Sequence, residues 1–80
     1  MAMTYYVVVP FGRSDEGDLV PLEPVEAPSG EAARRRASGV AATNAGAVAF
    51  SRTGDPDSGE FGDAVILATY GEVEKNMLGE

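Results

Sequence analysis

The chain has 80 residues, enough for one small domain, and its 13 acidic and 6 basic side chains give a net charge of −7. It contains no cysteine, histidine or tryptophan, which excludes disulfides, thiolate chemistry and imidazole catalysis. The excess of negative charge disfavours nucleic acid and anionic membranes as partners. Domains of this size have marginal stability and are often stabilised by disulfides, metals or oligomerisation. Without cysteines, we expect self-association.

The N-terminal residues lack the basic region of a signal peptide, and the apolar run at residues 5–9 ends at Pro10. No stretch approaches the roughly 18 apolar residues that a transmembrane helix needs. Absence of cysteine is compatible with the cytosol. We therefore expect a small, soluble, cytoplasmic protein.

The first two strands are predicted within the N-terminal third of the chain. Residues 5–11 are rich in β-branched and aromatic side chains, and they are apolar at both odd and even positions. The polar residues 12–18 connect them to a second extended segment, 19–26. There, Pro21 and Pro24 remove two ladder donors, which confines the segment to a sheet edge. One proline is at an odd position and the other at an even position, so their missing N–H groups would point to opposite sides of the strand. At least one would face the neighbouring strand, so we expect a bend or break there.

A helix is predicted to follow. Ser29 can cap its first N–H groups, and Glu31 suits the positive end of the helix dipole. Residues 32–43 continue the helix, and Asn44 or Gly46 can end it. Small side chains at spacings of three and four would let one helix face lie close to a sheet.

Two more strands are predicted after the helix. Residues 45–51 are rich in small apolar side chains, and residues 63–70 are apolar at both parities. A turn rich in Gly, Asp, Pro and Ser separates them. We expect one domain over residues 1–70 and a frayed C-terminal tail over residues 71–80.

This order gives an α+β fold of ββαββ type, with one helix packed on a four-stranded mixed sheet. The helical crossover should make the second and third strands parallel. The first and fourth strands are apolar on both faces and should be central, so the favoured spatial order is second, first, fourth, third. The order first, second, third, fourth is less favoured because it would bury the proline-containing strand.

One helix covers one sheet face and leaves the other available to a second copy, either through that face or through an edge strand. The candidate residues of this homodimer interface lie on the predicted first and fourth strands. They are Tyr5, Tyr6, Val7, Val8 and Tyr70.

The loop before the last strand holds four carboxylates within nine residues, which invites comparison with calcium sites. The EF-hand spacing fails, since Glu60 replaces the required glycine and Ile66 stands where a bidentate glutamate belongs. A solvated loop with Asx turns is favoured, so we expect no metal. Weak cation binding and a ligand or partner contact are the alternatives.

The only basic run in the sequence is Arg34-Arg35-Arg36, on the predicted helix. Glu31 is placed to pair with Arg34 or Arg35, which predicts an ordinary solvated face. Arginine also binds anions well, so contact with an acidic partner is the alternative. The candidate ligand or partner contacts are Arg34, Arg35, Arg36, Arg52, Asp55, Asp57 and Glu60.

Catalysis is disfavoured because the chain lacks histidine and cysteine, and its one lysine, Lys75, lies in the expected tail. We expect no catalytic residues and no cofactor. The favoured interpretation is a non-catalytic protein that binds a partner protein or a small ligand and forms a homodimer. The alternative is an acidic decoy or inhibitor that presents its carboxylates to a basic protein.

Overall fold

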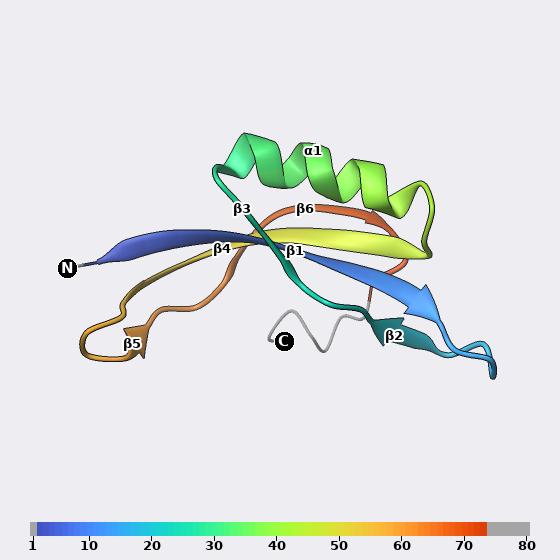
Figure 1. The fold of residues 1–80 in the computed structure, drawn as a ribbon, viewed down its shortest axis with the longest axis horizontal. Coiled ribbons are helices and arrows are strands. Elements are labelled where there is room, and N and C mark those ends of the chain that lie inside the picture. Colours follow the sequence, from blue (N-terminus) through green and yellow to red (C-terminus); the bar gives the residue numbers. More distant parts are fainter. Residues whose placement is uncertain (1, 74–80) are drawn as a thin grey trace.

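A computed structural model describes residues 2–73 as one helix lying across a curled antiparallel sheet of six strands (Figure 1). The predicted α+β class is confirmed. In chain order the elements are β1 (Met3–Arg13), β2 (Leu19–Pro21), β3 (Val25–Ala27), α1 (Gly30–Ala41), β4 (Gly46–Asp55), β5 (Glu60–Phe61) and β6 (Val65–Gly71).

The second predicted strand is divided into β2 and β3, which pair with different parts of β1. The expected break is confirmed, and it includes Pro24, while Pro21 is the last residue of β2. Opposite the break lies Pro10 of β1, which has no N–H to offer a neighbour. Its carbonyl accepts a hydrogen bond from the Leu22 amide at 2.8 Å. Prolines on both strands therefore meet where the ladder is interrupted.

The strand order corrects the prediction. Along its other side, β1 pairs antiparallel with β4, from Met3 opposite Gly54 to Phe11 opposite Gly46. Strand β6 pairs with β4 and lies at the sheet edge. The predicted segments thus lie in the order second, first, third, fourth, and every pairing is antiparallel. The mixed sheet with its first and fourth strands in the centre is wrong.

The third predicted strand lies in the centre of the sheet because of the way the helix packs on it. Ala47 and Ala49 of β4 are fully buried, as are Ala33 and Ala37 of α1, and the four belong to one cluster. Small side chains let the helix backbone approach the strand closely, so the alanine-rich strand takes the central place. Strand β6, despite its larger apolar residues, remains exposed at Val65, where 59% of the surface is accessible.

Helix α1 begins at the predicted cap but ends earlier than predicted, at Ala41, before Asn44 and Gly46. The Ser29 hydroxyl accepts a hydrogen bond from the Ala32 amide at 3.1 Å. After the last turn, the Asn44 side-chain amide donates to the Val40 carbonyl at 2.8 Å. Within the described part of the chain, no helix has the length and apolar character needed to cross a bilayer.

Two apolar clusters lie on opposite faces of the sheet, because successive residues of β1 point to opposite sides. Toward the helix, the buried residues are Val8, Ala27, Ala33, Ala37, Ala47 and Ala49. On the other face they are Val9, Phe11 and Val48. The prediction that β1 is apolar on both faces is therefore confirmed.

The chain remains in contact with the sheet just after β6. The Glu72 amide donates to the Ala45 carbonyl at 3.0 Å, and Val73 packs against the cluster that includes Phe11. The rest of the segment expected to form a tail, residues 74–80, lies outside the described residues.

We predict that Ala37→Leu lowers the free energy of unfolding by about 1–3 kcal/mol, because the larger side chain would push α1 away from β4. Urea denaturation followed by circular dichroism measures the change. Ser38→Leu is the control: this neighbour is exposed, so its effect should stay within about 0.5 kcal/mol. Equal stabilities of the two variants would contradict the close helix packing.

Candidate functional site

The sheet face opposite α1, called here the open face, carries a hollow at one end of the sheet. Cross-strand pairing sets Tyr5 opposite Arg52 and Val7 opposite Phe50, so these four side chains share the open face. Phe61 of β5 joins them through its pairing with Gly54 of β4. These five side chains line a hollow of about 380 Å³, the open-face hollow.

Gly54 makes the close approach of Phe61 possible. This glycine is buried, and a β-carbon built on it would overlap the Phe61 ring and the Glu60 carbonyl. The Phe61 ring therefore lies directly over β4, with its centroid 6.0 Å from that of Tyr5. Even so, 41% of Phe61 is exposed, so an apolar surface remains at the rim of the hollow.

Arg52 is the charged residue of the open-face hollow, and two contacts orient it. Its Nε donates to the Gly62 carbonyl at 2.9 Å, and its guanidinium carbon lies 5.5 Å from the centre of the Phe61 ring. Within residues 2–73, no carboxylate forms an ion pair with it. Its two terminal nitrogens can therefore donate to an incoming acceptor in the forked geometry typical of arginine.

The acidic loop between β4 and β5 is closed by its own hydrogen bonds, and the predicted Asx turn is confirmed. The Asp57 amide donates to Oδ1 of Asp55 at 2.9 Å, and the Gly59 amide donates to the Asp55 carbonyl at 2.8 Å. Gly59 has φ +77°, which favours glycine. Among the described residues, no group of three or more carboxylates is arranged to hold a metal ion. Glu60 begins β5 after this loop.

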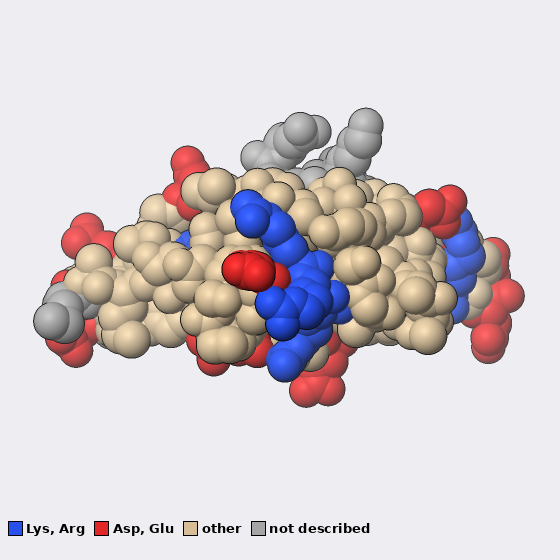
Figure 2. Space-filling model, turned by 90° about the horizontal axis from the view of Figure 1, so that it is seen from above, with Lys and Arg blue, Asp and Glu red and all other residues tan. Residues whose placement is uncertain are grey.

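The arginine run lies on the helix, on the other side of the sheet from the hollow. Figure 2 shows basic side chains gathered over the middle of this face. The predicted pair of Arg35 with Glu31 is confirmed at 3.4 Å, and Arg36 donates to the Glu26 carbonyl at 3.3 Å. Arg34 is exposed and has no ion-pair partner in the described part of the chain. The candidate contact residues are thus divided between two faces.

The candidate dimer residues are divided in the same way. Tyr5 and Val7 lie on the open face, whereas Val8 is fully buried beneath the helix. Tyr6 and Tyr70 pack against the helix-side cluster. The two-residue period of a strand separates neighbours in this way, so these five residues do not form one surface.

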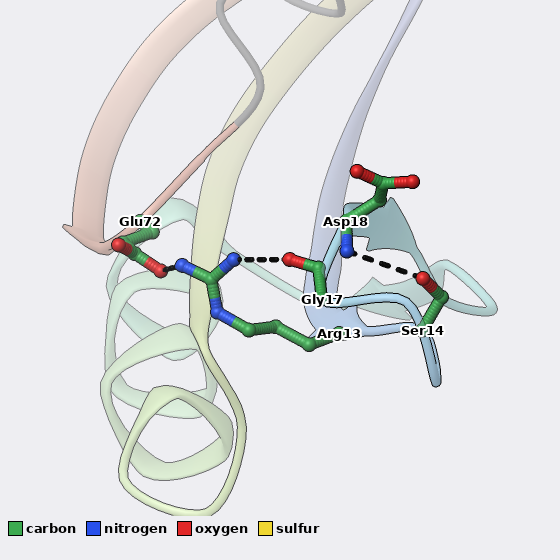
Figure 3. Close-up of polar contacts among 5 residues, drawn as sticks. All are labelled: Arg13, Ser14, Gly17, Asp18 and Glu72. Atoms are coloured by element: carbon green, nitrogen blue, oxygen red, sulfur yellow. Dashed lines mark hydrogen bonds and ion pairs between the residues drawn. The ribbon is translucent and has the colours of Figure 1, made fainter.

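At the opposite end of the sheet, Arg13 joins two segments that are far apart in sequence (Figure 3). Its Nη1 donates to the Gly17 carbonyl at 2.7 Å, and its Nη2 forms an ion pair with Glu72. The Ser14 hydroxyl accepts from the Asp18 amide at 3.2 Å within the same turn. Exposed pairs of this kind contribute about 0–1 kcal/mol, so we interpret Arg13 as a structural contact.

The sequence predicted Arg52 as a ligand or partner contact and Tyr5 and Val7 as dimer-interface residues, and it did not place them together. Phe50 and Phe61, which also line the hollow, were not among the predicted contacts. Phe50 and Arg52 are two residues apart on β4, which puts their side chains on the same face, but the predicted strand ended at residue 51 and placed Arg52 in the following turn. The position of Phe61 depends on the pairing of β5 with β4, which local pattern does not specify.

Comparison with protein families, curated proteins and solved structures found no match to this chain. Function is therefore inferred from the residues and contacts of the molecule itself. The open-face hollow combines exposed aromatic surface with an oriented cation, so it is the best candidate site.

We predict that Gly54→Ala lowers the free energy of unfolding by about 1–3 kcal/mol, because the new methyl group forces Phe61 and β5 outward. Chemical denaturation measures the loss, and faster hydrogen exchange at the Gly62 amide would report local opening. Gly39→Ala is the matched control, since a methyl there meets no atom within 4 Å. That change in the helix should raise stability by about 0.5–1 kcal/mol. Equal effects at the two positions would contradict the close approach at Gly54.

Proposed function

We propose that this chain is a non-catalytic binding protein that receives an apolar group of a partner protein or small ligand in the open-face hollow. The observation that carries the proposal is the hollow itself, an open depression of about 380 Å³ lined by three aromatic rings, Val7 and Arg52. Binding cavities for small molecules typically measure about 300–1,000 Å³ and have mostly apolar walls. Aromatic side chains also provide a large contact area with few rotatable bonds to immobilise.

Arg52 supplies the polar contact that such a site needs for orientation. Its hydrogen bond to Gly62 and its position over the Phe61 ring hold the guanidinium before any ligand arrives. A group that is already ordered loses less conformational entropy when it binds. We expect the bound group to carry an acceptor, such as a carboxylate or sulfonate, beside its apolar part.

The residues that line the hollow support binding rather than catalysis. They include no carboxylate, histidine or cysteine that could serve as a general base or nucleophile. The cysteine-free sequence also supports the proposed cytoplasmic location.

The alternative of an acidic decoy is supported by the net charge of −7. A decoy would be expected to present its carboxylates as a contiguous surface. On the helix side, Figure 2 shows carboxylates near both ends of the molecule and others beside the arginines in the middle, so they do not form one contiguous surface there. This distribution favours the hollow over the acidic side chains as the site of binding.

We predict that the neutral apolar dye Nile red binds the protein with increased fluorescence, and that Phe61→Ser weakens binding roughly tenfold by removing a wall of the hollow. Val65→Ser is the matched control, because Val65 is an exposed apolar residue that does not line the hollow. Circular dichroism establishes that both variants fold. Equal dye affinity in the two variants would mean that the dye binds elsewhere, which would contradict the proposed site.

We predict that Arg52→Gln weakens binding of the anionic dye anilinonaphthalene sulfonate about tenfold while leaving Nile red affinity unchanged. A hydrogen bond to a charged group contributes about 1.5–3 kcal/mol, which is large enough to produce this change. Arg34→Gln removes the same charge from the helix side and serves as the control. If both variants weaken the anionic dye equally, Arg52 acts through net charge alone and not as a ligand contact.

A further inference from the structure

The two edges of the sheet differ in their ability to pair with another strand. One edge, formed by β2 and β3, is interrupted and carries Pro21, Pro24 and the carboxylate of Glu23, all of which hinder pairing with another chain. The other edge, β6, reads Val-Ile-Leu-Ala-Thr-Tyr-Gly, without proline or charge. No described strand pairs with its outer side. The register with β4 shifts between Ala49 and Phe50, which leaves Leu67 of β6 unpaired as an irregularity. The regular, unprotected part of this edge is therefore residues 68–71.

The register shows which backbone groups of β6 point outward. The Gly62 amide donates to the Thr53 carbonyl at 2.9 Å, so odd-numbered residues of β4 direct their backbone groups toward β5 and β6. Ala49 is one of these residues and pairs with Ala68. The backbone groups of Ala68 therefore point inward, and those of the next residue, Thr69, point outward. Thr69 is exposed, so its N–H and C=O are accessible to a further strand.

We propose that a second copy of this chain pairs with this edge, β6 against β6 in antiparallel orientation, to form one continuous sheet across the dimer. A two-fold axis makes an antiparallel strand complementary to itself, so the edge fits a second copy without any new surface. The pairing would also cover Val65 and Ile66, which are 59% and 38% exposed.

Charge at the two ends of β6 is compatible with this pairing. Beyond its C-terminal end, Glu72 already forms an ion pair with Arg13, which reduces its repulsion toward a second copy. Before its N-terminal end, Asp63 is the nearest carboxylate. Each copy still carries a net charge of −7, so the remaining repulsion should be screened by salt. Dimerisation is therefore expected to strengthen as ionic strength rises from about 0.02 M to 0.5 M.

This pairing leaves the open-face hollow free in both copies, because the lining residues come from β1, β4 and β5 and none from β6. The dimer does not depend on the proposed ligand binding. Failure of dye binding would leave the edge proposal intact, and a monomeric protein could still bind dye.

Sedimentation velocity of the full chain at increasing concentration tests the proposal. We expect a species of about twice the 8.3 kDa chain mass. Thr69→Pro removes the outward N–H and should weaken the dimer at least tenfold, whereas Thr69→Val keeps both the amide and the side-chain shape and should leave the dimer unchanged. If Thr69→Pro does not fold, Thr69→Lys replaces it, because lysine on an edge strand opposes pairing while preserving the backbone.

Two results would overturn the edge pairing. The first is a wild-type protein that stays monomeric up to about 1 mM at the higher salt, a concentration at which even weak specific complexes form. The second is a dimer that persists in the folded Thr69 variants but dissociates in Phe61→Ser, which would indicate face-to-face packing through the open face.

Discussion

The contact between the alanines of α1 and those of β4 is the constraint on which the rest of this structure depends. Ala33 and Ala37 lie against Ala47 and Ala49, and all four are fully buried. A methyl side chain allows close approach but buries little apolar area, so this layer stabilises the fold less than a core of larger residues would. The chain therefore relies also on the apolar cluster around Phe11 on the other face of the sheet.

The position of β4 under the helix determines where both candidate surfaces lie. With β4 in the centre, β1 flanks it on one side and β6 becomes an edge. The odd residues of β1 then face away from the helix and combine with alternate residues of β4 to line the open face. At the far end of β4, Gly54 lets Phe61 lie over the strand and complete the hollow. The candidate binding site and the open edge both follow from the packing of the helix on β4.

Features that depend on neighbouring residues could be predicted, and features that depend on distant ones could not. The Ser29 cap, the Glu31–Arg35 pair and the Asx turn at Asp55 each form within five residues, and all are present. Strand order depends on which strand accepts the helix. Counting large apolar residues favoured the wrong strand, because small side chains decide that contact. The place of Phe61 beside Tyr5 likewise depends on a register between separate strands.

A domain of this size is marginally stable. Its net negative charge also opposes association with a second copy. The proposed sheet continuation would suit such a molecule, because backbone hydrogen bonds would join the copies along a narrow uncharged strand. Packing through the open face would instead cover the hollow and oppose two identical faces that each carry Arg52. Edge pairing would leave Arg52 and its aromatic neighbours accessible, so the proposed self-association and the proposed ligand binding are compatible with each other.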